Sequence, residues 1–65
     1  MSNESPLIQF FSYTHLPPHL QKVSAPFGDL AQQLQDTLPD NCEREAALRK
    51  LLEAKDCAVR ALLMK

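Results

Sequence analysis

One long amphipathic segment, residues 43–64, constrains the fold of this chain more than any other feature. At about 100° per residue, its charged side chains cluster on one side of a helix and its alanine, leucine and valine side chains on the other. The apolar side is about 200° wide, whereas a surface helix with one neighbour needs about 100°. The sequence therefore predicts a helix that needs more cover than a single partner helix gives. Lys55 lies in the middle of its apolar side.

A first helix is predicted over residues 17–38, where apolar residues recur at i, i+3 and i+4 along one stripe. The prolines at 17–18 suit a first helical turn, in which a missing N–H has no partner to lose. Pro26 removes the hydrogen bond to the Lys22 carbonyl, which leaves two alternatives. One kinked but continuous helix preserves the phase of the stripe better, and the other alternative is a restart with Ser24 as its cap.

The run Leu38-Pro39-Asp40-Asn41 is the clear turn in the second half of the chain. Two long helices joined by a short turn form an antiparallel hairpin, so the predicted fold class is all-α. Asp40 followed three residues later by Glu43 resembles a capping box and predicts the start of the second helix.

Aromatic residues gather ahead of the first helix, since three of the four in the chain lie within residues 10–16. Phe11 and Tyr13 alternate with hydroxyl side chains, a period typical of a strand, and one strand is not stable alone. We expect an extended arm that lies against the helices or against a neighbouring chain. Residues 1–9 are expected to form a flexible N-terminus and residues 10–65 the helical-hairpin domain.

A chain of 65 residues forms one small core, which rarely supplies more than about 3–5 kcal/mol without disulfides, a metal or association. Cys42 and Cys57 would lie about 22 Å apart on one helix, too far for a disulfide bond. His15 and His19 are separated by two prolines and have no cysteine pair beside them, so no metal site and no cofactor are expected. Association with other chains is the expected source of additional stability.

The formal net charge of −1 argues against binding to polymeric DNA or RNA, which requires many contacts from cations to phosphates. It is compatible with a small anion held by a few local cations. The first residues lack the basic and apolar regions of a signal peptide, and no stretch approaches the roughly 18 apolar residues of a membrane span. We therefore expect a protein of the cytoplasm that does not enter a membrane.

The wide apolar side of the second helix has two explanations. Helices of neighbouring chains can cover it, with Ala47, Ala54, Ala58 and Ala61 allowing close approach, or the aromatic arm can fold back over it within one chain. We favour association because the isolated core would be small. Lys55 would then reach water, a carboxylate of a neighbouring chain, or an anion in a pocket at an interface. Replacement of Lys55 by methionine is expected to be neutral or stabilising.

No catalytic set of residues is visible, so we do not expect an enzyme. The carboxylates lie mostly on the solvated face of the second helix, and Cys57 has no histidine near it in the sequence. Gly28 is the single glycine, which excludes a glycine-rich phosphate loop.

Several short runs are spread over about residues 10–63: Phe11-Ser-Tyr-Thr-His-Leu-Pro17, Leu20-Gln21 with Ser24-Ala-Pro-Phe27 and Leu30-Ala31, Glu43-Arg44, Ala47-Leu-Arg-Lys-Leu-Leu-Glu-Ala-Lys-Asp56, and Ala58-Val-Arg-Ala61. As a set they resemble a family of small phage proteins, the helical-hairpin domain shared by anti-CBASS and anti-Thoeris nucleotide sponges. The resemblance implies a compact oligomer of helical hairpins, commonly a hexamer.

By this resemblance the chain would sequester cyclic nucleotide immune signals in the host cytoplasm without cleaving them. The signals would be cyclic dinucleotides, held in pockets between two protomers, or cyclic trinucleotides or cyclic ADP-ribose isomers. Tyr13 would stack on a base, and Lys22 and Ser24 would contact phosphates. Cations of the second helix, among which the resemblance does not choose, complete the candidate ligand-binding residues: Arg44, Arg49, Lys50, Lys55 and Arg60.

A second hypothesis is a small helical adaptor that binds a host protein through its apolar face. It predicts a monomer or dimer with exposed apolar surface and no affinity for small ligands. A phosphodiesterase acting on the same cyclic nucleotides ranks third, because the sequence offers no metal site and no acid–base pair.

Overall fold

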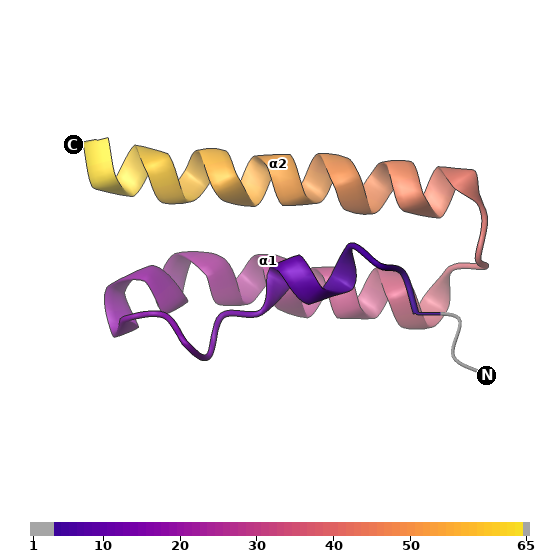
Figure 1. Ribbon diagram of the computed structural model, residues 1–65, viewed down its shortest axis with the longest axis horizontal. Helices are drawn as coiled ribbons and strands as arrows, with labels where there is room; N and C mark the ends of the chain where they lie inside the picture. Colours follow the sequence, from indigo (N-terminus) through magenta and orange to yellow (C-terminus); the bar gives the residue numbers. More distant parts are fainter. Residues whose placement is uncertain (1–3, 65) are drawn as a thin grey trace.

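The structure, a computed structural model, describes residues 4–64, and this range is mostly helical. A short 3-10 helix, η1 (Ile8–Phe11), precedes two long helices, α1 (Pro18–Thr37) and α2 (Cys42–Met64). Figure 1 shows α1 and α2 side by side and antiparallel, joined by the turn at residues 38–41. The predicted all-α hairpin is confirmed, because each helix begins and ends within one residue of its expected bounds.

α1 continues through Pro26 without a break, as the preserved phase of its apolar stripe indicated. Pro18 takes the first helical position, where proline gives up no hydrogen bond. The N–H of Gln21 donates to the Pro17 carbonyl at 2.9 Å and closes the first turn. Ser24 lies inside the helix and is buried, so the alternative of a restart capped by Ser24 is excluded.

Asn41, and not Asp40, caps α2. The Asn41 side-chain oxygen accepts a hydrogen bond from the backbone N–H of Arg44 at 2.9 Å, which satisfies a donor that the first turn leaves unpaired. Asp40 instead accepts a hydrogen bond from the Arg44 guanidinium at 3.1 Å. The predicted capping box of Asp40 and Glu43 was wrong, since the cap is the next residue, Asn41. Asparagine and aspartate cap about equally well, so the residue types alone did not distinguish the two positions.

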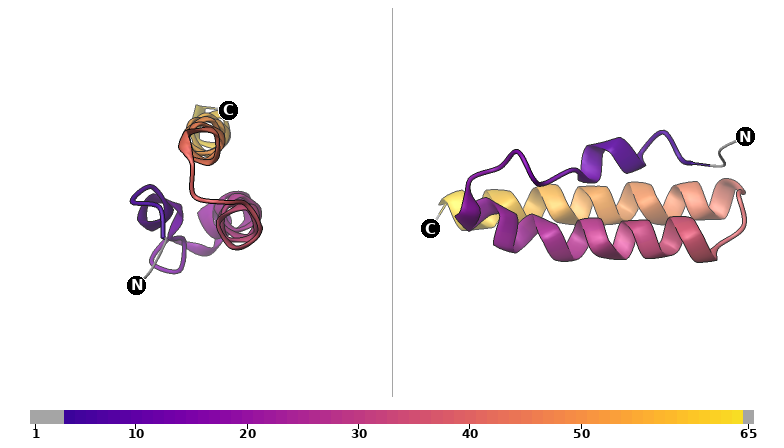
Figure 2. Two further views of the ribbon diagram at one scale, coloured as in Figure 1. Left: turned by 90° about the vertical axis from the view of Figure 1, so that its right-hand side faces the viewer. Right: turned by 90° about the horizontal axis from the view of Figure 1, so that it is seen from below.

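The N-terminal segment, residues 4–17, lies along both helices. In the end-on view of Figure 2, this segment, α1 and α2 occupy the three corners of a triangle. Phe11 packs with Ala31 of α1 and Leu48 of α2, and these are the buried apolar residues of the described chain. Partly buried apolar residues surround them: Leu7, Ile8, Phe27, Leu34, Leu51 and Leu52. The fold therefore has three packed elements around a very small core.

The N-terminal segment differs from the expected extended arm in one part, because residues 8–11 form the 3-10 helix η1. The alternation of Phe11 and Tyr13 covers too few residues to specify a strand, and the hairpin offers no strand to pair with it. η1 directs the Phe11 side chain into the core instead.

Among the described residues, Ser5 already contacts both helices, ahead of the predicted domain boundary at residue 10. The Ser5 hydroxyl donates to the Glu45 carboxylate at 2.6 Å, and its backbone N–H donates to the Gln35 side-chain oxygen at 3.0 Å. Residues 1–3 of the expected flexible N-terminus lie outside the described residues. The first turn of α2 and the N-terminal segment are thus held together at the turn end of the hairpin.

The N-terminal segment covers part of the wide apolar side of α2, near Leu48 and Leu52. Folding back of the arm, the less favoured of the two explanations, therefore accounts for part of that surface. Apolar side chains elsewhere are exposed, among them Leu30, Leu38, Leu63 and Met64, the last two at 61% and 80%. The two most exposed, Leu63 and Met64, lie at the end of the hairpin opposite the turn.

Candidate functional site

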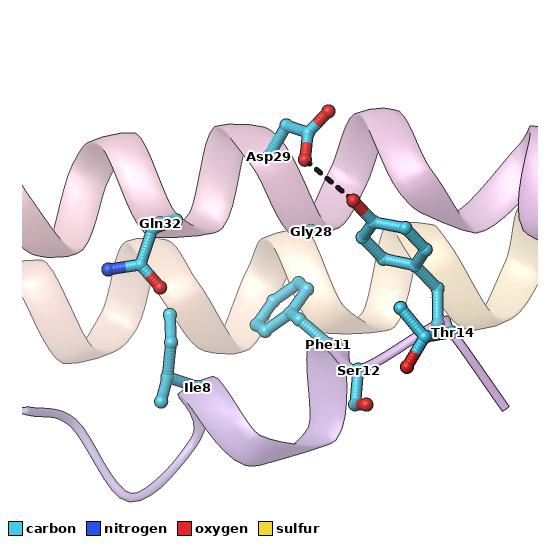
Figure 3. A pocket seen from close by; sticks show the side chains of 8 residues that line it. Ile8, Phe11, Ser12, Thr14, Gly28, Asp29 and Gln32 are labelled. Carbon is cyan, nitrogen blue, oxygen red and sulfur yellow. Dashed lines mark hydrogen bonds between the residues drawn. The ribbon is translucent and has the colours of Figure 1, made fainter.

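An open groove of about 370 Å³ lies between the N-terminal segment and α1. The N-terminal segment contributes Ile8, Phe11, Ser12, Tyr13 and Thr14, and α1 contributes Gly28, Asp29 and Gln32. Figure 3 shows Ile8 and Phe11 extending toward α1, with Asp29 and Gln32 on the facing helix. The volume of the groove is at the lower end of the range of small-molecule sites and is enough for one nucleobase.

Gly28 allows the N-terminal segment to approach α1 closely. A Cβ atom at this position would lie 2.9 Å from the Phe11 carbonyl oxygen and 2.9 Å from the Tyr13 ring, closer than such atoms pack. The Tyr13 ring therefore lies directly against the helix at this point. Because the ring is only half-buried, it still presents surface to the groove.

Tyr13 is held in place by Asp29. Its hydroxyl donates to the Asp29 carboxylate at 3.1 Å, the dashed line in Figure 3. The pKa of Tyr13 is raised above its ordinary value of 10.0, first because the hydrogen bond retains the proton, then because the carboxylate is negative, and last through slight desolvation. The ring is consequently neutral and oriented at physiological pH.

The charge of the groove comes from a carboxylate. No lysine, arginine or histidine is among the eight residues that line it, all of which belong to the described part of the chain. Lys22 is exposed on α1, about 20° from Asp29 around the helix axis and about 10 Å from it along that axis. A phosphate would thus find its cation beside the groove and not inside it.

Ser24, one of the predicted phosphate contacts, is not brought to the groove. It is 1% exposed, and its hydroxyl has no hydrogen-bond partner in the structure. In this arrangement of the single chain, a ligand at the surface does not reach it.

Arg44 serves the fold at the turn end. Its guanidinium is buried and lies 3.1 Å from Asp40 and 3.5 Å from Glu45, while Glu45 accepts the Ser5 hydroxyl. These contacts tie the N-terminal segment to the first turn of α2. Arg44 is therefore a poor ligand residue in this arrangement, although the sequence placed it among the candidates.

Lys55 finds partners within its own chain. Its ammonium donates to the Phe10 carbonyl at 2.6 Å, lies 5.8 Å from the centre of the Phe11 ring, and approaches Asp56 at 3.8 Å. Its side chain is only 12% exposed. The cation on the apolar side of α2 thus caps the carbonyl end of η1, a partner that the three predicted alternatives did not include.

The remaining predicted cations, Arg49, Lys50 and Arg60, are exposed on α2, which contributes no lining residue to the groove. The Arg60 guanidinium donates to the Cys57 sulfur at 3.3 Å. Of the candidates from the sequence, Tyr13 lines the groove and Lys22 shares its helix face. Asp29 and Gln32 were missed, although a lone glycine inside a helix, Gly28, is a signal of close backbone approach.

Comparisons of the chain with protein-family models, with curated proteins and with solved structures return no match. What the groove binds is therefore inferred from its own chemistry. No group of three or more histidine, cysteine, aspartate or glutamate residues within 4–64 is arranged to hold a metal ion. Over the same residues, neither helix is long and apolar enough to cross a membrane.

Proposed function

We propose that this protein is a phage anti-defence protein that binds a cyclic nucleotide signal in the host cytoplasm and sequesters it without cleaving it. The observation that carries the proposal is the groove in which the half-buried Tyr13 ring is hydrogen-bonded to Asp29, which lies about two helical turns from the exposed Lys22 on α1. An aromatic ring stacks on a base and a lysine meets a phosphate, so the pair matches both parts of a nucleotide. The resemblance of residues 10–63 to nucleotide sponges supports the same ligand class.

Binding without turnover fits the two titratable side chains that line the groove. General acid–base catalysis works best with a group whose pKa lies near the operating pH. The pKa of Tyr13 is raised further from that range, and its hydroxyl is engaged in the hydrogen bond to Asp29. Both side chains are thus suited to orient a ligand.

An oligomer would complete the site. A cyclic dinucleotide carries two bases related by approximate twofold symmetry, whereas one groove of about 370 Å³ is the size for one base. Grooves of two protomers related by a twofold axis would each take one base. The exposed Leu30, Leu63 and Met64 offer apolar surface for such contacts. The resemblance to nucleotide sponges favours a hexamer.

The direct test is calorimetric titration against a panel of cyclic dinucleotides, cyclic trinucleotides and cyclic ADP-ribose isomers. We expect micromolar or tighter binding to at least one of them, and its absence throughout the panel would overturn the proposal. Release of the ligand by heating, followed by chromatography, should return it intact. Recovery of a cleaved product would indicate a phosphodiesterase.

Two pairs of variants locate the site. Tyr13→Ala should weaken binding by about 1–3 kcal/mol without changing the oligomer, because stacking on one base is worth that much. Phe10→Ala is its control, since Phe10 is an aromatic residue, 54% exposed, that does not line the groove. Lys22→Ala should weaken binding, whereas Lys50→Ala, which removes an exposed lysine of α2, should not.

The adaptor hypothesis is supported by one observation, the exposed Leu63 and Met64 at the end of the hairpin opposite the turn. A host protein could cover them in place of a second copy of the chain. Light scattering coupled to size-exclusion chromatography separates the two hypotheses. A stable hexamer counts against the adaptor, and a monomer without affinity for the ligand panel favours it.

A further inference from the structure

The groove presents hydrogen-bond acceptors at its rim. The Asp29 carboxylate accepts hydrogen bonds through two oxygens, which offer about four acceptor sites. The Tyr13 hydroxyl uses one of these sites, at 3.1 Å, and the exposed carboxylate retains the others. A ring stacked on Tyr13 would place its edge within reach of this carboxylate.

Guanine is the base whose edge matches a carboxylate. Its N1–H and N2–H₂ groups are two adjacent donors, which two carboxylate oxygens can accept together. Adenine and cytosine each place a ring-nitrogen acceptor beside their amino group, so a carboxylate would face an acceptor and be repelled. Uracil offers a single N–H between two carbonyl oxygens. Discrimination of this kind depends on leaving wrongly matched polar groups unpaired.

The surroundings of Asp29 reinforce this match. No cation lines the groove, so its carboxylate is available to a neutral donor edge and disfavours a phosphate at the same position. Gln32, one turn further along α1, donates one amide hydrogen to Asp36 at 2.9 Å and has a second for an acceptor such as guanine O6. Lys22 lies two turns in the other direction, where the phosphate of the same nucleotide would lie.

We propose that this groove is a guanine site, in which Asp29 accepts both Watson–Crick-edge donors of a guanine that stacks on Tyr13. The proposal rests on the proposed function and adds the base that the sponge selects. Its ligand is a guanine-containing cyclic nucleotide, with cyclic di-GMP as the probe and cyclic di-AMP as the matched competitor of equal charge and ring size.

Calorimetric titration of the full chain gives the first test. Cyclic di-GMP should bind about 10–100-fold more tightly than cyclic di-AMP, because a bidentate pair discriminates between bases by that much. Cyclic di-IMP, which lacks only the N2 amino group, should fall between them. Equal affinity for the guanine and adenine ligands, or tighter binding of an adenine-only ligand, would overturn the guanine site while leaving a sponge in place. No binding of any ligand would overturn the proposed function itself.

The variant Asp29→Asn gives the second test, because it keeps the shape of the side chain and replaces one acceptor by a donor. Affinity for cyclic di-GMP should fall about 10-fold or more, and affinity for cyclic di-AMP should not fall. Glu53→Gln is the control, since it removes one negative charge from the exposed face of α2. A preference for guanine that persists in Asp29→Asn, with helicity equal to that of the parent by circular dichroism, would also overturn the assignment.

Discussion

The two ends of the hairpin are built differently. At the turn end, Asn41 caps α2, Arg44 is buried between two carboxylates, and Ser5 fastens the N-terminal segment to Glu45. At the other end, where α1 starts and α2 stops, Leu63 and Met64 are exposed. We call the turn end, which side-chain hydrogen bonds and ion pairs hold together, the closed end. The other end, where apolar side chains are exposed, is the open end.

This difference shows how so small a chain can hold a groove in place. Within residues 4–64 the buried apolar core consists of three residues, so the N-terminal segment needs polar contacts to stay on the hairpin. The closed end supplies one set, and Lys55 supplies another where it binds the Phe10 carbonyl. The open end is left with apolar surface that a further chain can cover. The predictions below probe whether stability and recognition are divided between these two parts.

The largest effect is expected at Leu48, which is fully buried near the closed end. Leu48→Ala should cost about 2–5 kcal/mol of unfolding free energy, comparable with the total that a core of this size supplies. Urea denaturation followed by circular dichroism should show a largely unfolded chain. Leu63→Ala is the matched change at the open end and should stay within about 0.5 kcal/mol in the monomer. Equal losses from both would show that the open end is covered, and so the two ends would not differ.

Gly28→Ala should give the next largest effect, at the middle of the molecule. The added methyl group meets the Phe11 carbonyl oxygen, which is backbone and cannot rotate away. Overpacking costs about 1–3 kcal/mol and outweighs the gain of about 1 kcal/mol in helix propensity. Hydrogen exchange should rise in residues 8–14 while α1 stays protected. Gln33→Ala, at an exposed position of the same helix, should leave both unchanged, and unchanged exchange in Gly28→Ala would contradict the close approach.

The sequence was sufficient for the hairpin but not for the groove. Apolar spacing, with the prolines at 17–18 and the turn at 38–41, located both helices, and the preserved phase across Pro26 favoured one continuous helix over a restart at Ser24. The partners of Tyr13 and Lys55 depend on how the N-terminal segment folds back, and no local pattern encodes that path. The Phe10 carbonyl that binds Lys55 is backbone, which every residue carries, so its role is invisible in side-chain chemistry. Asp29 lacked a visible partner because its partner, the Tyr13 hydroxyl, reaches it only when the N-terminal segment folds back.

Lys55→Met tests the contact that holds the N-terminal segment near the middle of α2. Methionine retains most of the packing but loses the hydrogen bond to the Phe10 carbonyl, so a loss of about 1 kcal/mol is expected after allowance for partial exposure. The contact thus reverses the neutral or stabilising effect expected from the sequence. Chemical denaturation measures it, with Lys50→Met as the exposed control. A neutral or stabilising result for Lys55→Met would show that the ammonium prefers water to the carbonyl.

The smallest effect concerns the titration of Tyr13, which is the single tyrosine in a chain without tryptophan and so has an unobstructed phenolate absorbance. Its pKa should lie above 10.0 and fall toward that value in Asp29→Asn, because the hydrogen bond and the negative charge both retain the proton. Since the unfolded chain then loses this proton first, the contribution of Tyr13 to stability is constant below about pH 10 and decreases above it. Ser5→Ala, which loosens the closed end, should leave the pKa unchanged because Gly28 and the bonds from Gln21 to Thr14 and Leu16 hold the groove locally. A lowered pKa in Ser5→Ala would instead show that the closed end supports the groove from a distance.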